Sequence, residues 1–270
     1  MSAKAESIST QGALPRTEFV SAVGRAMKIL ECFTSEESVR HQGRLTLTDV
    51  AKITGLTRGT SRRLLLTLKQ INYVDTDGKM FWLTPKLINL SRGFLVPISL
   101  GEESARTLER LTRSLDESSS VGMLDGGVIV YIERVEVRRI YSSSITNGTR
   151  LPAACSSIGR VLLAALSDKD LHNWLRLYKL NGFTEKTITD PLEFWEEIER
   201  IRAQGYAIND EELEIGIRSI AVPIKSPSGR TIAALNASTV SARHTKEDLV
   251  EHFLPKLIET SHELAVTVGW

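Results

Sequence analysis

The 270-residue sequence has only two cysteines, Cys32 and Cys155, and no apolar run long enough to cross a bilayer. Two isolated cysteines do not make a disulfide framework, and the polar start of the chain lacks the apolar segment of a secretion signal. The five histidines have no metal-ligand spacing, and no phosphate-binding or dinucleotide-binding glycine motif is present. We therefore expect a cytoplasmic protein that uses no membrane, no metal and no cofactor.

The net charge of +1 hides an uneven distribution of charge along the chain. Residues 1–99 contain 14 Lys and Arg against 8 Asp and Glu, whereas residues 100–270 contain 20 against 25. A basic N-terminal part and an acidic C-terminal part are typical of a nucleic-acid-binding module joined to a module with another task. Because each neutralised phosphate releases counterions, binding by the basic part should weaken steeply with salt.

The stretch TLTDVAKITGLTRGTSRRLLLTL, residues 46–68, predicts two short helices joined by a tight turn. Thr46 and Asp49 have the spacing of a capping box, in which each side chain bonds the backbone N–H of the other residue. Gly55 ends the first helix, since glycine adopts the left-handed C′ conformation at little cost. Thr57 then caps the second helix, which follows it directly.

The second helix of this pair combines an inward face with a cationic face. Ser61 and three leucines recur at helical spacing and should face the core, which leaves the arginines toward solvent. In a helix-turn-helix protein the first turns of such a helix enter the major groove, where Arg pairs with guanine and Thr reaches several acceptors. Gly59 costs roughly 1 kcal/mol relative to Ala within a helix, which suits a backbone that must approach DNA closely. An ordinary surface helix with solvated arginines is the alternative interpretation.

The segment NYVDTDGKMFWL, residues 72–83, predicts a β-hairpin with Asp77-Gly78 as its turn. Helix, helix and hairpin in this order indicate a winged helix-turn-helix, and a dimer of such domains implies an approximately palindromic site. The candidate DNA-binding residues divide by role into Arg58, Thr60 and Arg62 for base edges, Thr57 and Arg63 for phosphates or bases, and Lys79 for the DNA backbone.

Helices are expected on both sides of this module. One starting at Phe19 should pack behind the helix pair through Val23, Met27 and Leu30, and a charged loop should follow it. Thr84-Pro85 supply a cap and a first-turn proline for a linker helix that is apolar on much of its circumference and should pair with its copy in a dimer. We thus expect a disordered tail at 1–18, a winged helix-turn-helix at 19–83, a linker helix at 84–99 and an effector-binding domain at 100–270.

The C-terminal part mixes strand-like and helical segments. Two strand-like runs flank Asp125-Gly126-Gly127, which is a hairpin signal, and residues 205–225 and 231–239 are strand-rich. A closing helix over 244–268 should be interrupted near Pro255. Five or six strands with helices before, between and after them predict an α+β domain with an antiparallel sheet.

Cys155 stands just before a predicted helix, where the pKa of a thiol can fall. It supports an alternative in which the C-terminal part is an enzyme for a small molecule with Cys155 as the nucleophile. A nucleophilic cysteine needs a base and an orienting group, and no histidine motif supplies them. A nonspecific DNA-organising protein is a third interpretation, which predicts no preference beyond charge and no ligand response.

Several motifs, in order, resemble the IclR-type bacterial transcription regulators. GLTRGTSRRLLLTL and YVDTDGKMFWLTPKLINL are similar to the winged helix of that family, and LPAACSSIGRVLLAAL, GYAINDEELEIGIRSIAVPI and AALNAST to its GAF-like effector domain. The resemblance covers roughly residues 19–268. GLTRGTSRR, LNAS and FLPKL further resemble the subgroup that controls aromatic-acid breakdown through the β-ketoadipate pathway. The resemblance implies a homodimer, or a pair of dimers, that binds promoter DNA and responds to a small carboxylic acid.

The resemblance also implies a ligand pocket of hydroxyl and amide side chains facing a helix N-terminus, whose free N–H groups favour an anion. Ser157-Ile158 depart from the Gly-Ala pair frequent in the family, so the bulky Ile158 should reshape the pocket. Arg160 and Arg218 are candidate partners for the ligand carboxylate. Helix capping and turn closure are the alternative roles for the same polar residues. The expected effector-binding residues are Ser157, Ile158, Asn209, Ser219, Asn236 and Ser238.

Overall fold

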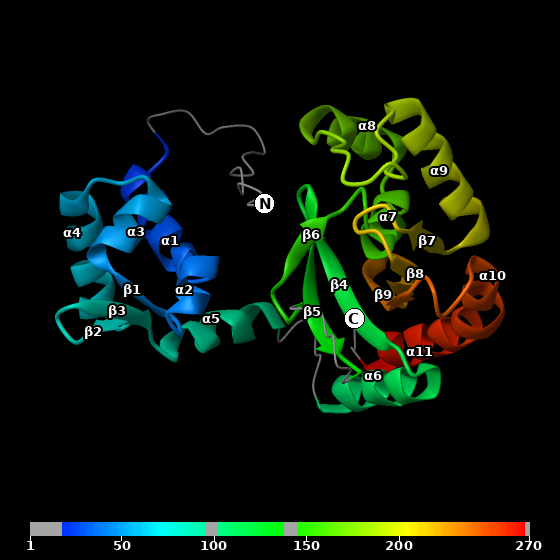
Figure 1. Cartoon of the computed structure of the whole chain (residues 1–270), viewed down its shortest axis with the longest axis horizontal. Coiled ribbons are helices and arrows are strands. Elements are labelled where there is room, and N and C mark those ends of the chain that lie inside the picture. Colours follow the sequence, from blue (N-terminus) through cyan, green and yellow to red (C-terminus); the bar gives the residue numbers. More distant parts are fainter. Residues whose placement is uncertain (1–17, 96–101, 138–144, 268–270) are drawn as a thin grey trace. The chain divides into compact units, whose positions relative to one another are not determined.

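The computed structural model describes residues 18–95, 102–137 and 145–267. The chain divides into two compact units, residues 1–96 and 97–270 (Figure 1). Apart from its last position, the expected disordered tail lies outside the described residues, as does the end of the expected linker helix. Within the described ranges, no helix is long and apolar enough to cross a membrane.

The N-terminal unit is a helical domain with a small antiparallel sheet of strand order β1-β3-β2. Its core is a single cluster in which the helices pack against the hairpin. The elements are α1 Ser21–Cys32, α2 Glu36–Arg40, β1 Arg44–Thr46, α3 Leu47–Thr54, α4 Arg58–Gln70, β2 Val74–Thr76, β3 Met80–Leu83 and α5 Lys86–Leu95. Helices α3 and α4 followed by the β2–β3 hairpin are the winged helix-turn-helix that the sequence predicts.

The local signals of the helix pair act as the sequence indicates. The backbone N–H of Thr46 donates to Asp49 Oδ2 at 2.9 Å, and the N–H of Asp49 donates to Thr46 Oγ1 at 3.2 Å. Gly55 ends α3 with φ of 69°. Thr57 caps α4 by accepting a hydrogen bond from the N–H of Thr60 at 3.2 Å. The turn between the helices is therefore specified by short-range chemistry alone.

Two parts of this unit differ from the sequence-based expectation. Helix α1 is present, but Val23 and Met27 are 59% and 47% exposed, and α1 enters the core through Ile29 and Leu30 at its C-terminal end. The expected charged loop after α1 contains α2, and β1 follows it and pairs with β3. A three-residue strand has too little alternation to be recognised before its partner is known.

The C-terminal unit is an α+β domain around one antiparallel sheet of six strands, in the order β6-β5-β4-β9-β8-β7. Strand β6 was not expected, because it has only three residues. The elements are α6 Glu102–Leu115, β4 Ser118–Asp125, β5 Val128–Val135, β6 Arg150–Pro152, α7 Ser157–Ala164, α8 Asp168–Leu177, α9 Pro191–Gln204, β7 Ala207–Asp210, β8 Ile217–Lys225, β9 Thr231–Val240, α10 Lys246–Asp248, the π-helical turn η2 Leu249–Phe253 and α11 Leu254–Thr267.

Helices cover both faces of this sheet. One face packs against α6 and α11, and α7, α8 and α9 lie over the other (Figure 1). The closing helix changes to a π-helical turn just before Pro255, as its sequence predicts, because proline has no N–H to donate to the preceding turn. The two faces thus have separate apolar cores, and the face beneath α7 is where polar residues gather.

Candidate functional site

The cationic side chains of α4 are placed to meet an external partner. Arg58, Arg62 and Arg63 are exposed, and none of them forms a salt bridge with another described residue. Ser61, Leu65 and Leu68 face the core, which fixes the rotation of the helix. Thr60 is half-buried, and its hydroxyl accepts from the hydroxyl of Thr57 at 3.0 Å. The arrangement presents three arginines from the first two turns of one helix.

Gly59 has an open surface in this first turn. A Cβ atom built on it would meet no atom within 4 Å, and its φ lies in the ordinary helical range. Neither packing within the protein nor backbone conformation therefore requires glycine at this position. The surface at Gly59 is instead open to close approach by a partner molecule, which would itself require glycine here.

The wing carries further cations around the β2–β3 turn. Lys79 is exposed beside Asp77, whose carboxylate accepts the N–H groups of Lys79 and Met80 at 2.9 and 2.8 Å and so forms the turn. These hydrogen bonds lower the pKa of Asp77. Arg44 stacks over the ring of Trp82 at 4.3 Å, with Nη1 3.7 Å from Asp77 Oδ2. The wing thus holds Lys79 at its tip on a rigid turn.

A second candidate site lies on the α7 face of the large sheet, where residues in register form rows across the strands. One row consists of Asn209, Ser219, Ser238 and Ser118 and is wholly polar. The next row begins with two small residues, Ala207 and Ala221, and continues with three polar residues, Asn236, Ser120 and Arg134. Helix α7 packs on the small residues, so the polar part stays uncovered.

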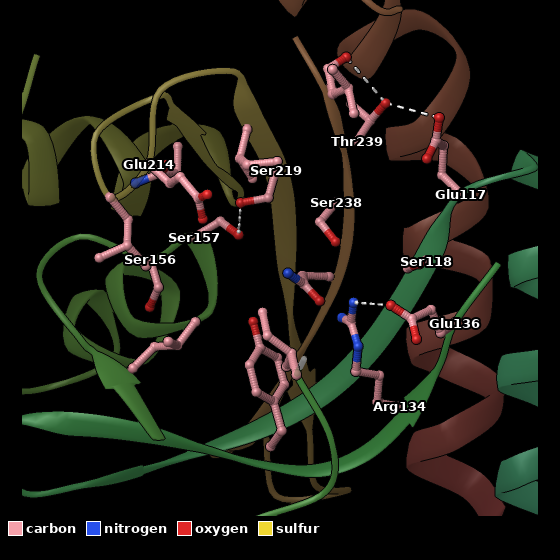
Figure 2. Close-up of a pocket in the computed structure, with 18 of the residues that line it drawn as sticks. Glu117, Ser118, Arg134, Glu136, Ser156, Ser157, Glu214, Ser219, Ser238 and Thr239 are labelled. Atoms are coloured by element: carbon pink, nitrogen blue, oxygen red, sulfur yellow. Dashed lines mark hydrogen bonds and ion pairs between the residues drawn. The ribbon is translucent and has the colours of Figure 1, made fainter. Parts of the chain in front are cut away.

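The uncovered part forms a cavity of about 420 Å³ (Figure 2). This volume is within the range of small-molecule sites. Apolar walls are provided by residues such as Tyr131, Leu151 and Leu213. Five of the six expected effector-binding residues line the cavity: Ser157, Asn209, Ser219, Asn236 and Ser238.

Ile158 does not belong to the cavity wall, in contrast to the expectation. It is 1% exposed and lies in the core over β4, with Cγ2 3.1 Å from the position that a Cβ of Gly122 would take. The first turn of α7 directs Ser157 to the cavity and the next side chain into the sheet. The larger residue is therefore accommodated by the glycine below it rather than by the ligand space.

The end of the cavity at α7 is rich in hydroxyl and amide groups. Ser156 caps α7 by accepting the N–H of Gly159 at 3.0 Å. The hydroxyls of Ser157 and Ser219 are 2.8 Å apart, and Asn209 Nδ2 donates to the carbonyl oxygen of Cys155 at 2.8 Å. The helix N-terminus adds a partial positive charge at this end.

Arg134 stands at the other end of the cavity and is the residue that sequence reasoning missed. Its side chain is 6% exposed, and Nη1 donates to Ser120 Oγ at 2.9 Å. A bulge makes this possible, because Ile132 is an extra residue where β5 pairs with β4, between the pairs Gly122–Tyr131 and Val121–Glu133. Strict alternation would have turned Glu133, not Arg134, to the same face as Tyr131.

The two arginines that were candidates for the ligand carboxylate are structural. Arg160 is 1% exposed and forms an ion pair with Glu212, with Glu197 Oε1 3.6 Å from its Nη1. Arg218 is bound to Asp210, with 2.6 Å between Nη2 and Oδ1, and donates to the carbonyl oxygen of His244 at 2.5 Å. Neither lines the cavity.

Two buried polar side chains, Tyr131 and Asn236, line the cavity. Burial raises the pKa of Tyr131, although the nearby Arg134 charge and a hydrogen bond with Asn236 act in the opposite direction. The Oδ1 atom of Asn236 accepts no hydrogen bond from any described residue, and the side chain is 3% exposed. A buried amide oxygen without a partner is a site that a ligand donor or a water would satisfy.

The segment between β7 and β8, residues 211–216, forms one wall of the cavity through Leu213 and Glu214. Glu211 has the unusual φ of 61°. Its carboxylate accepts the Lys186 ammonium and the Ser241 hydroxyl, each at 2.5 Å, and these bonds lower the pKa of Glu211 to about 2. The wall is therefore held by electrostatic anchors outside the cavity.

Cys155 lines the cavity but is not suited to nucleophilic chemistry. Burial raises the pKa of its thiol to about 11, so it is protonated at neutral pH. Its Sγ lies 3.8 Å from the carbonyl oxygen of Asn181, and no histidine lines the described part of the cavity. In the described ranges, no group of three or more His, Cys, Asp or Glu is placed to hold a metal ion.

A winged helix with exposed arginines on its second helix, joined to a domain with a polar cavity, defines a transcription regulator with its own effector-binding domain. The sequence matches the family descriptions "IclR helix-turn-helix domain" over residues 22–78 and "Bacterial transcriptional regulator IclR C-terminal" over residues 94–266. The chain belongs to the IclR family of bacterial transcriptional regulators and is not an enzyme.

Individual relatives agree with this assignment. The chain is 37% identical to the Pca regulon regulatory protein of Pseudomonas putida over 248 residues, which are 92% of this chain and 84% of that protein. The solved structure of a putative transcriptional regulator, RHA06195 from Rhodococcus sp. RHA1, is 43% identical, with a TM-score of 0.77 and coverage of 93% of this chain and 98% of that one.

The inducer-binding domain of the PobR transcription factor from Acinetobacter was solved as a double mutant in complex with 3-hydroxybenzoic acid. It is 32% identical, with a TM-score of 0.58, and covers 61% of this chain and 96% of that domain. These findings confirm the family resemblance, the subgroup and the α+β fold that the sequence indicated.

Proposed function

We propose that this regulator binds an approximately palindromic promoter site as a homodimer, or as a pair of dimers, in the cytoplasm. Its effector is a small carboxylic acid, namely an aromatic acid or an intermediate of the β-ketoadipate pathway. The effector acts by binding one arrangement of the dimer better than another, which shifts the population of the form that is active on DNA.

The observation that carries the effector proposal is the buried Arg134 in a cavity whose other described lining residues are uncharged or acidic. An arginine side chain that is 6% exposed and lines a cavity is a strong partner for a ligand carboxylate. Glu136 forms an ion pair with Arg134 in which Oε1 lies 3.8 Å from Nη2, a separation longer than a hydrogen bond. A ligand carboxylate at hydrogen-bond distance would interact more strongly than Glu136 does.

The apolar part of the cavity favours an aromatic or extended acid over a two-carbon or three-carbon acid. From Arg134 on β5 to Ser219 on β8 the cavity crosses three strand spacings, roughly 14 Å. The PobR domain in complex with 3-hydroxybenzoic acid supports an aromatic acid for this chain.

On DNA, the proposed roles follow the exposed cations of α4 and the wing. Arg58, Thr60 and Arg62 contact base edges, Thr57 and Arg63 contact phosphates or bases, and Lys79 contacts the DNA backbone. The exposure of these arginines, and their lack of salt bridges to other described residues, support this assignment.

The test is fluorescence anisotropy of DNA from beside the gene for this protein, against scrambled DNA, with and without 4-hydroxybenzoate and protocatechuate. We expect a salt-sensitive preference for the native fragment that one acid alters. Arg134→Gln should keep the DNA preference and lose the acid response, whereas Arg176→Gln, an exposed position on α8, should behave as the parent. Equal binding to both DNAs would refute the proposal for DNA, and an unchanged response in Arg134→Gln would refute the proposed site.

A further inference from the structure

We infer that the cavity selects a monocarboxylate with a hydroxyl group at its far end and rejects a dicarboxylate of the same length. The carboxylate lies at Arg134, and the hydroxyl lies between Glu214 and the Ser157–Ser219 pair. This inference rests on the proposed function and names the class of acid that the proposed site takes.

The acids of the cavity differ in how they are neutralised. Glu117 Oε1 is 2.9 Å from Arg243 Nε and also accepts the hydroxyl of Thr239 at 2.9 Å. Glu136 lies near Arg134. Glu214, in contrast, is an exposed residue that lines the same cavity and has no cationic partner among the residues that the structure describes. Among the described lining residues, the Arg134 end of the ligand space therefore holds a paired cation, and the α7 end holds a carboxylate without a cationic partner.

The Glu214 side chain is directed toward the N-terminal end of α7, where the helix dipole by itself would favour a bound anion. Figure 2 shows its carboxylate pointing toward Ser157 and Ser219, on the side of the cavity away from Arg134 and Glu136. The protein thus places its own negative charge near the N-terminus of α7. A second ligand carboxylate at this end would meet a like charge, whereas a hydroxyl could donate to Glu214.

The hydrogen-bonding capacity of the cavity agrees with this charge pattern. The hydroxyls of Ser157 and Ser219, 2.8 Å apart, share one hydrogen bond, so the pair still offers one O–H and free lone pairs. Such a pair can accept a hydrogen bond from a phenol and also donate one to it.

The test compares three para-substituted benzenes by isothermal titration calorimetry on the full chain: 4-hydroxybenzoate, benzoate and terephthalate, in which a carboxylate replaces the hydroxyl. We expect the parent protein to bind 4-hydroxybenzoate at least tenfold more tightly than terephthalate. Two like charges about 4 Å apart near a protein surface repel strongly enough for a difference of this order. Benzoate should lie below 4-hydroxybenzoate, because it leaves the acceptors at the α7 end unsatisfied.

The variant Glu214→Gln removes the charge and keeps the shape, so it should narrow the gap between 4-hydroxybenzoate and terephthalate by about tenfold. Glu251→Gln removes a charge from an exposed position outside the cavity and should leave the gap unchanged. Equal affinity of the parent for the two acids, or an unaltered gap in Glu214→Gln, would overturn the inference while the proposed function stands. If none of the three acids bound or changed DNA binding, the inference and the proposed aromatic effector would both be wrong.

Discussion

Gly59 offers a test in which stability and DNA binding should move in opposite directions. The position is in the first turn of α4, with ordinary helical φ, and an added Cβ would meet nothing within 4 Å. Gly59→Ala should therefore stabilise the N-terminal unit by up to about 1 kcal/mol, because Ala loses less backbone entropy than Gly in a helix. For a unit of this size such a gain raises the melting temperature by about 4–8 °C.

The same methyl group should weaken DNA binding if the first turn of α4 enters the major groove. Forcing an extra methyl into a close-packed contact costs typically about 1–3 kcal/mol, which corresponds to a loss of roughly fivefold to 150-fold in affinity. The assay is anisotropy on the native promoter fragment together with a thermal melt of the same preparation. No intramolecular contact would explain a loss of affinity in a protein that has become more stable.

A matched control is available further along the same helix. Thr67 is exposed, eight residues or about 12 Å from Gly59 along the axis, and its hydroxyl bonds only the carbonyl oxygen of Arg63, at 2.9 Å. Thr67→Ala also improves helix propensity and should leave DNA binding unchanged. If Gly59→Ala bound the promoter as well as the parent, the first turn of α4 would not approach DNA closely, and the proposed orientation of the reading helix would be refuted.

Four further predictions test other parts of the molecule. Arg62→Ala should cost about 1–3 kcal/mol of DNA binding and relax specificity at one base pair per half-site, which a panel of operator variants measures. If Arg62→Ala bound every operator variant as the parent protein does, a base contact by Arg62 would be refuted. Arg160→Met should lower the free energy of unfolding by about 3–5 kcal/mol in denaturant titrations, because it leaves the buried Glu212 carboxylate without its cationic partner. Cys155→Ser should keep DNA and effector binding nearly intact, and at pH 7.5 the parent thiol should react slowly with iodoacetamide because its pKa is raised to about 11. The pKa of Glu211 in the folded protein is lowered from 4.5 to about 2, so its anchoring of residues 211–216 should be complete above pH 4.5 and lost as the pH falls toward 2. Protection of this segment from hydrogen exchange should therefore fall over this pH range, and Glu211→Gln should abolish that pH dependence.

Local signals predicted the N-terminal unit well, because its elements are specified within a few residues of chain. The capping box at Thr46, the left-handed Gly55 and the cap at Thr57 need no tertiary information, and each is present. The inward side of α1 was predicted less well. Val23 and Met27 have helical spacing with Leu30, but only the C-terminal end of α1 reaches the core. Periodicity identifies an apolar face and not the length over which a neighbour covers it.

Residues that line the cavity were predicted on β9, where side chains alternate regularly, and missed on β5, where the pairing with β4 is irregular. Asn236 and Ser238 point to one face of β9, as strict alternation requires, and both line the cavity. Arg134 could not be found in this way, because the extra residue Ile132 shifts the side-chain phase of β5. The bulge depends on how β4 and β5 pair, and pairing is a property of two segments that neither sequence carries alone.

Arg160 shows why a charge near a site is a weak functional signal. Its position after the α7 cap suggested a ligand contact, yet 1% exposure and three buried hydrogen bonds, to Ala154 and to both oxygens of Glu212, assign it to the core. The sequence could not distinguish these outcomes, since the partner carboxylate is 52 residues away. Arg134 and Arg160 are thus both buried, and what separates them is that Arg134 lines the cavity whereas Arg160 does not.

One face of the large sheet packs against α7 and also forms the cavity. Side-chain size determines where the packed part ends and the cavity begins. Gly122 and the alanines of β7 and β8 let α7 approach, whereas the polar residues beside them remain uncovered. Ile158 lies at this boundary. Its Cγ2 and Cδ1 would lie 3.1 and 3.2 Å from a Cβ at position 122, so its bulk depends on the glycine below it. A larger residue at 122 would displace α7 and with it Ser157, so a position outside the cavity controls the geometry of its polar end.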